Sequence, residues 1–117
     1  MALARSLGVA LLGVRGHVVE VEADIAQGLP AFVLVGLPDA SLVEARDRVR
    51  AATANSGCPL PPRRITVNLS PATLPKQGSG FDLAVAVAVL AAAGTVPAAA
   101  ARAVHLGELG LDGALRP

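Results

Sequence analysis

The stretch with the most chemical potential is the loop Leu74–Asp82, which reads LPKQGSGFD. It combines one lysine and two glycines with the expected start of a helix near Phe81. Free backbone N–H groups and the helix dipole attract anions at such a start, and glycines let a ligand approach the backbone. The candidate anion-binding residues of this loop are Lys76, Gly78, Ser79 and Gly80.

The structural alternative for the same loop is a capped helix start. In that interpretation Ser79 and Asp82 bind free helix N–H groups, and Lys76 faces solvent. The loop is not a nucleotide-binding P-loop, because the pattern G-x-x-x-x-G-K-[ST] occurs nowhere in the chain.

Two further groups of charged residues were considered as sites. Arg63 and Arg64 follow a proline-rich linker and are candidates for phosphate contact, although adjacent arginines beside a strand commonly just face water. The acids Glu20, Glu22 and Asp24 share the solvent side of one expected strand. They have no neighbouring His or Cys, so an exposed strand face explains them better than a metal site does.

No residue pattern predicts catalysis, a metal site or a cofactor site within this chain. Cys58 is the single cysteine, which excludes an internal disulfide, and we interpret it as a small, partly buried hydrophobic residue. His17 and His105 lie in no cysteine-nucleophile motif, and neither H-E-x-x-H nor G-x-S-x-G is present.

Composition limits the class of protein. The 117 residues suit one domain, and 53% apolar against 16% charged residues excludes a disordered tail. A formal charge of +1 argues against bulk electrostatic capture of DNA or RNA. The apolar run Leu83–Ala93 is shorter than the roughly 20 residues of a bilayer span, so we expect a buried helix, no membrane contact and a cytoplasmic protein.

The elements that must position these residues can be predicted from periodicity. Apolar and acidic residues alternate along His17–Ile25, which indicates a half-exposed strand, and Leu7–Val14 precedes it. Arg15-Gly16 would form the hairpin turn between them. Ala31–Gly36 is continuously apolar, which predicts a central strand of the sheet.

Two helices are expected. Ser41 and Glu44 fit a capping box, an apolar stripe follows, and Gly57 can close the helix in a left-handed conformation. The stripe consists of Leu42, Ala45, Val49 and Ala52. The second helix would begin near Phe81, with Ser79 as its N-cap, and stop at Gly94.

The remaining segments complete the sheet. Arg64–Leu69 and Val104–Leu109 are expected strands, and Asp112-Gly113 is a hairpin turn leading into Ala114–Leu115. The order predicts an α/β (α+β) fold in which two main helices pack on a mixed β-sheet, as a single domain spanning 1–117. The last expected strand has barely begun at Pro117, so we expect this chain to be part of a longer protein.

Six segments together resemble the N-terminal domain of the YifB/ComM family, bacterial AAA+ ATPases described as magnesium-chelatase-like. They are GLPAF (28–32), VGLPDA (35–40), EARDRVRAA (44–52), PPRRITVNL (61–69), LPKQGSGFDL (74–83) and LGELGLDG (106–113). The resemblance covers nearly the whole chain. It implies a fold like the catalytic domain of Lon protease, also likened to domain 2 of a ribosomal small-subunit protein.

The resemblance also implies what surrounds this domain. An AAA+ module binding ATP and Mg²⁺ would follow in the same chain, and the full-length protein would be a homo-hexamer. ComM proteins act as ATP-driven DNA helicases in branch migration. We therefore expect a non-catalytic domain that assists DNA handling or ring assembly, with DNA as a candidate partner through Arg63, Arg64 and Lys76.

Two alternatives stay open, a degenerate serine peptidase and a purely protein-interaction module. The Lon active loop, Pro-Lys-Asp-Gly-Pro-Ser, places its nucleophile on Gly80 and its second proline on Ser79, and the catalytic lysine would lie beyond this chain. A peptidase would therefore have to use Ser79. Thr73 and Gln77 stand where the family usually carries acids, which leaves Lys76 more available to an anion and weakens a metal site.

Overall fold

The computed structural model describes residues 2–12, 15–37, 39–71, 76, 80–97, 99 and 102–116. Its elements are β1 (Ala2–Leu12), β2 (Arg15–Ala26), β3 (Ala31–Val35), α1 (Asp39–Asn55), β4 (Arg64–Ser70), α2 (Asp82–Ala92), β5 (Glu108–Leu109) and β6 (Leu115–Arg116). The order of strands and helices along the chain confirms the one predicted from periodicity.

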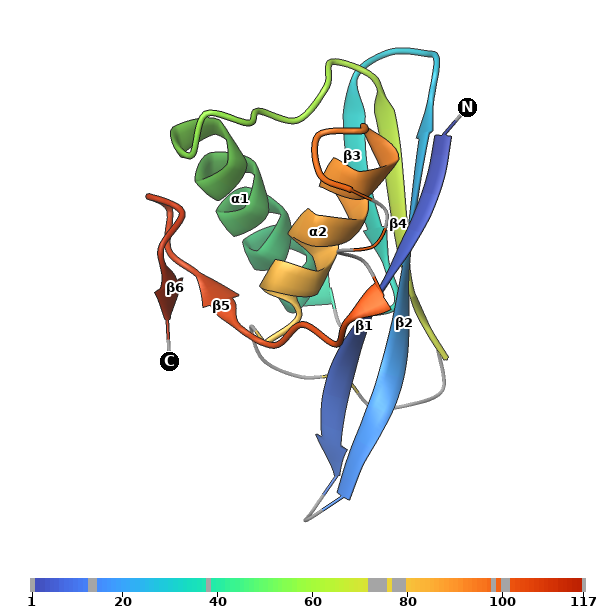
Figure 1. The fold of residues 1–117 in the computed structure, drawn as a ribbon, viewed down its shortest axis with the longest axis vertical. Helices are drawn as coiled ribbons and strands as arrows, with labels where there is room; N and C mark the ends of the chain where they lie inside the picture. Colours follow the sequence, from blue (N-terminus) through green and yellow to red (C-terminus); the bar gives the residue numbers. More distant parts are fainter. Residues whose placement is uncertain are drawn as a thin grey trace.

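Four strands form a mixed sheet in the order β1-β2-β4-β3. β1 and β4 both pair antiparallel to β2, whereas β3 runs parallel to β4. Both helices lie on one face of this sheet, as Figure 1 shows, and β5 and β6 form a separate small hairpin. The predicted α+β fold, with two helices on a mixed sheet, is confirmed.

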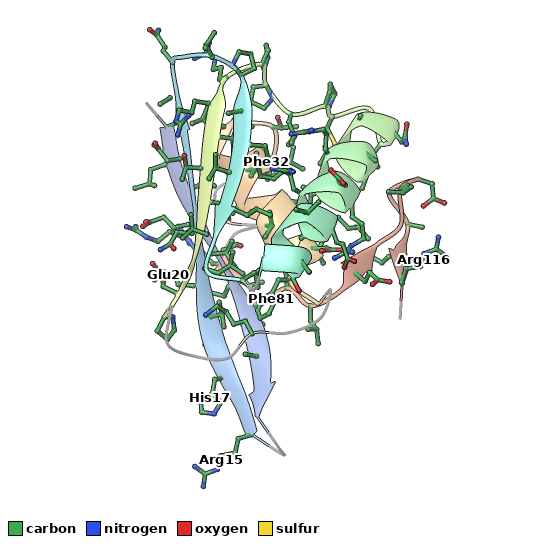
Figure 2. All side chains as sticks on the ribbon, turned by 180° about the vertical axis from the view of Figure 1, so that it is seen from behind. Arg15, His17, Glu20, Phe32, Phe81 and Arg116 are labelled. Atoms are coloured by element: carbon green, nitrogen blue, oxygen red, sulfur yellow. The ribbon has the colours of Figure 1, made fainter. Side chains whose placement is uncertain are left out.

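Alternation along β2 and β4 separates the two faces of the sheet. The inward residues of these strands are Val19, Val21, Ala23, Ile25, Ile65, Val67 and Leu69, and all are at most 5% exposed. Figure 2 shows Glu20 on the side of the sheet away from the helices, with Phe32 and Phe81 on the helix side. Small aliphatic side chains and these two aromatic rings therefore make the core, because the chain has no Trp or Tyr.

Helix α2 lies close against β1 and β2, and α1 packs beside it and against β3. Ser6 points inward from β1 and donates a hydrogen bond from Oγ to the carbonyl of Ala84 at 2.6 Å. Gly8 is needed on the same face, because a Cβ there would lie 3.0 Å from Cδ1 of Phe81. β1 and α2 are thus held at a short separation.

Two strand predictions were wrong. Arg15 and Gly16 are not a turn but pair with Leu12 and Leu11 inside the hairpin, so that the strand pattern of β2 begins earlier than expected. β3 lies at the edge of the sheet rather than at its centre. Its continuous apolar run needs no central position, because Phe32 and Leu34 fill the core while Val35 stays 46% exposed.

The helix starts also differ from the predictions. α1 already begins at Asp39, so Ser41 lies within the helix and is not its cap. The N-cap of α2 is Phe81, without a side-chain cap hydrogen bond, which corrects the assignment of Ser79. The helix ends agree better, since Gly57 and Gly94 both have positive φ.

The expected strand Val104–Leu109 is reduced to two short pieces. Val104 forms an isolated parallel bridge with Leu7 of β1, and β5 contains only Glu108 and Leu109. The turn at Asp112-Gly113 is confirmed, because β5 and β6 pair antiparallel on either side of it. Gly113 has φ +92°, which favours glycine.

The apolar segment 83–93 was predicted to be a buried helix, and α2 bears this out with Ala84, Val85, Ala88 and Val89 fully buried. Within the described residues, the structure has no helix with the length and apolar character needed to cross a membrane.

Candidate functional site

The most buried charge in the described residues belongs to Asp82, at the start of α2. Its carboxylate receives two hydrogen bonds from Arg48 of α1, Nε to Oδ2 at 2.6 Å and Nη2 to Oδ1 at 3.1 Å. The backbone N–H of Leu109 in β5 donates to Oδ2 at 3.1 Å. One carboxylate therefore ties together both helices and the C-terminal hairpin.

The contact with Asp82 favours the charged form of Arg48. The hydrogen bond to Asp82 is the largest cause that raises the pKa of Arg48, against a smaller opposing effect of burial. Asp82 also lies in the first turn of α2, where the helix dipole stabilises a negative charge. With its hydrogen-bonding capacity taken up by the fold, Asp82 is a structural residue rather than an acid poised for catalysis.

Sequence reasoning missed this pair, because it interpreted Asp82 as a helix cap and assigned no partner to Arg48. A signal was present, because Arg48 follows Ala45 by three residues and precedes Ala52 by four, which puts it beside the buried stripe. Asp82 was also the lone carboxylate leading into a long apolar run. Charged residues at such positions are rarely buried without a partner.

Of the loop before α2, the structure describes Lys76 and the residues from Gly80 onward. Lys76 is 2% exposed, and its Nζ donates a hydrogen bond to the carbonyl of Pro71 at 2.5 Å. The expectation that it faces solvent is wrong, and burial lowers its pKa. A lysine held in this way supports the local backbone.

Gly80 has a structural use as well. Its carbonyl accepts a hydrogen bond from Gly107, and a Cβ at this position would lie 3.2 Å from Leu106. Gly107 in turn accepts a hydrogen bond from the N–H of Leu83. Four other loop residues discussed above, Thr73, Gln77, Gly78 and Ser79, lie outside the described residues.

Arg63 and Arg64 lie where the linker enters β4, and both are exposed. The backbone carbonyl of Arg63 accepts a hydrogen bond from Ala31, so the main chain is fixed while the side chain projects. Neither guanidinium is in an ion pair with another described residue. The structure thus brings these two candidates together, and it separates them from the buried Lys76.

Two of the three acids in the row on β2, Glu20 and Glu22, are paired across the sheet. Arg5 of β1 lies 3.3 Å from Glu20 and 2.8 Å from Glu22. Among the described residues, no group of three or more His, Cys, Asp or Glu side chains is arranged to hold a metal ion. The interpretation of this row as a charged strand face is supported by its ion pairs.

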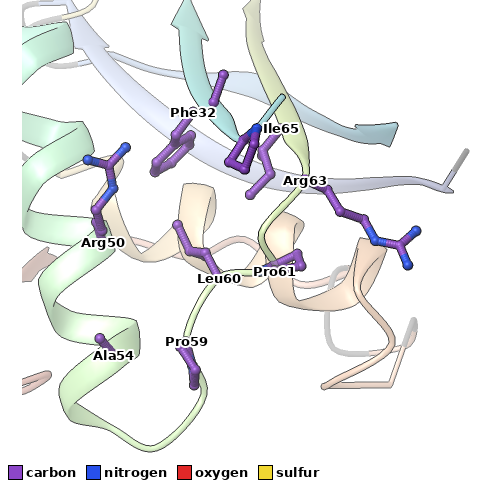
Figure 3. Close-up of a pocket in the computed structure, with 10 residues that line it drawn as sticks. Phe32, Arg50, Ala54, Pro59, Leu60, Pro61, Arg63 and Ile65 are labelled. Atoms are coloured by element: carbon purple, nitrogen blue, oxygen red, sulfur yellow. The ribbon is translucent and has the colours of Figure 1, made fainter. Parts of the chain in front are cut away.

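Beside Arg63, the edge of the sheet opens into a groove of about 280 Å³ (Figure 3). It lies between the C-terminal half of α1, the start of β3 and the linker into β4. Its lining residues are Pro30, Ala31, Phe32, Arg50, Ala54, Pro59, Leu60, Pro61, Arg63 and Ile65. The lining contains two cations and no acid or nucleophile, which suits binding rather than bond-breaking chemistry.

These observations define the structural class of the protein. This is a small α+β fold in which the buried pair of Arg48 and Asp82 joins the two helices and in which Arg50, Arg63 and Arg64 are exposed. Residues 21–117 match the family described as subunit ChlI of Mg-chelatase, and the chain belongs to that family.

Individual relatives agree with this assignment. The chain is 55% identical to an uncharacterized protein of Mycobacterium tuberculosis over its whole length, which is 24% of that protein. It is 49% identical to the uncharacterized protein YifB of Escherichia coli, with 92% of this chain and 21% of YifB covered. It is 44% identical to competence protein ComM of Haemophilus influenzae, with 99% and 23% covered. The chain spans about a quarter of the length of these relatives, and its similarity to YifB and ComM confirms the predicted family.

Proposed function

We propose that this chain is the non-catalytic N-terminal domain of a YifB/ComM-type AAA+ ATPase, and that it supplies contacts for assembly of the protein. ATP and Mg²⁺ would bind to an AAA+ module of the same chain, in a homo-hexamer in the cytoplasm. Support comes from the family match and from the relatives, of which this chain covers about a quarter.

One structural observation carries the proposal. The charged residues of the described part divide into those that pair within the fold and those that project from it. Asp82 and Arg48 bind each other and so connect α1 with α2, and Lys76 donates a hydrogen bond to a backbone carbonyl. Arg50 and Arg63 project beside an apolar groove without a nucleophile or general base. Such a surface can hold a partner but offers no group to break a bond.

Two measurements test this function. The purified 117-residue chain should hydrolyse ATP with Mg²⁺ no faster than a buffer blank, and hydrolysis above that background would overturn the proposal. Reading the gene beyond Pro117 should reveal Walker motifs, because the proposal assigns nucleotide chemistry to the same polypeptide. A stop codon directly after Pro117 would contradict it.

DNA contact is a second candidate, favoured by the adjacent exposed side chains of Arg63 and Arg64. Phosphate contacts release counterions, so the affinity for DNA should fall steadily with salt. A gel-shift titration at several salt concentrations, with Arg63→Gln/Arg64→Gln as the variant, measures this. With a net charge of +1 we expect weak binding by one copy, strengthened when several copies act together. Binding that is unchanged in the double variant would remove this candidate.

A further inference from the structure

The groove beside β3 has an apolar floor. Phe32 and Ile65 come from neighbouring strands and are 5% and 1% exposed, so only their edges reach the opening. Leu60 and the prolines of the linker form the facing wall, and Ala54 forms the side contributed by α1 (Figure 3). A hollow with these walls gains most by enclosing an aliphatic side chain, since burial of apolar surface drives binding.

The two flanks of the groove carry positive charge. Arg50 of α1 leans over Phe32, with its guanidinium carbon 5.9 Å from the ring centroid. Arg63 extends outward on the opposite flank, as Figure 3 shows. No acidic residue lines the groove, and neither arginine is in an ion pair with another described residue. A ligand that crosses the groove would therefore meet a cation on each side of its apolar contact.

We propose that this groove is a docking site for an acidic peptide segment, in which one aliphatic side chain enters the groove and flanking carboxylates bind Arg50 and Arg63. This inference rests on the proposed contact function of the domain and specifies its partner. Charge complementarity selects the acids, and the apolar floor selects the anchor.

A single strand of nucleic acid fits the groove less well. Proteins that bind single strands present aromatic faces on which bases stack. Among the described residues that line the groove, the only aromatic ring is that of Phe32, which is almost fully buried with Arg50 placed over it. The chain contains no Trp or Tyr that could supply another stacking face.

The test uses the 117-residue chain and fluorescein-labelled probes in fluorescence anisotropy. The first probe is a short peptide with one leucine flanked by aspartates and glutamates. The second carries asparagine and glutamine in place of those acids, and the third is a single-stranded oligo-dT. We expect the acidic peptide to bind more tightly than both other probes, with an affinity that weakens as salt is raised.

Three variants locate the binding. Arg50→Gln and Arg63→Gln should each weaken the acidic peptide about threefold, the range of an exposed ion pair. Ala54→Leu keeps helix propensity and charge but fills the groove, so it should weaken binding about tenfold or more by excluding the anchor. The matched control is Arg15→Gln, an exposed arginine at the far end of the β-hairpin (Figure 2), which should leave affinity unchanged. Circular dichroism confirms that each variant is folded.

Every outcome decides the matter. Equal binding of the acidic and amide peptides, or full binding by Ala54→Leu, would overturn the docking site. Preference for oligo-dT with loss in Arg50→Gln would replace it with a nucleic-acid site. Self-association of the chain that Ala54→Leu abolishes would assign the groove to a second copy instead. ATP hydrolysis by the chain would refute the proposed function, whereas absent peptide binding without hydrolysis would refute only this inference.

Discussion

Two arginines of helix α1 are only two positions apart but have different surroundings. Arg48 points toward α2 and is bound in two hydrogen bonds to the buried Asp82. Arg50 is exposed, lies over Phe32, and has no carboxylate partner among the described residues. On a helix such neighbours lie about 200° apart, so one faces the second helix and the other faces the groove. The same residue type thus serves the fold at one position and a surface at the other.

The largest expected effect comes from breaking the buried pair. Asp82→Asn keeps the size of the side chain but removes the buried counter-charge of Arg48, and Arg48→Gln leaves the buried carboxylate of Asp82 without a cation. Each should lower the free energy of unfolding by about 3–5 kcal/mol. Urea unfolding followed by circular dichroism measures this, because the chain has no Trp or Tyr for fluorescence.

The matched control for that experiment is Glu22→Gln. Its ion pair with Arg5 is exposed, with side chains 34% and 55% accessible, so the loss should be at most about 1 kcal/mol. If Asp82→Asn cost no more than Glu22→Gln, the pair with Arg48 would not hold the two helices and the hairpin together.

A smaller effect is expected at the exposed arginine. Arg50→Gln removes only a cation placed over the ring of Phe32, an interaction worth about 0.5–1 kcal/mol at an exposed site. The free energy of unfolding should therefore change by no more than about 1 kcal/mol in the same urea experiment. A loss of stability as large as that of Arg48→Gln would show that Arg50 also stabilises the fold. Arg48 and Arg50 would then not differ in role.

The smallest effect concerns Lys76, a third cation, which is buried and donates a hydrogen bond to the carbonyl of Pro71. Burial lowers its pKa from the ordinary value of 10.5, which the unfolded chain keeps. Between the lowered pKa of Lys76 in the folded state and its pKa in the unfolded state, the unfolded state binds more protons. The free energy of unfolding should therefore rise with pH in this range. Urea unfolding at a series of pH values below 10.5 should show this rise.

The variant for this prediction is Lys76→Met, in which the rise should be absent. Lys76 is the only lysine and the chain contains no tyrosine, and the variant keeps Cys58 and the N-terminal amine, which also titrate at alkaline pH. An identical pH profile in the variant would show that another group causes the dependence.

Much of the fold could be predicted from the sequence, and the failures have identifiable causes. Alternation in β2 and β4 is a local property set by one buried and one exposed face, so these strands were found. The edge position of β3 could not be inferred, because an apolar run records burial and not the number of neighbouring strands. The cap of α2 was misplaced because Ser79 has the right residue type, whereas the helix starts after Phe81.

The candidate site was predicted less completely. Arg63 and Arg64 were singled out from their position after the prolines, and the structure places both at the surface. Arg50 was not among the candidate residues. Its proximity to Phe32 and to the linker depends on how α1 crosses the sheet, and no local pattern records that crossing.

The sequence by itself determined the family, the order of elements and the small aliphatic core, because motifs and periodicity are written in neighbouring residues. Only the tertiary structure decided which charged side chains pair within the fold and which stay exposed and able to bind a partner. Asp82 and Arg48 are 34 residues apart, and Arg50 and Arg63 meet the same groove from different elements. Pairing of charges depends on distance and burial in three dimensions, and these exist only after the helices have packed on the sheet.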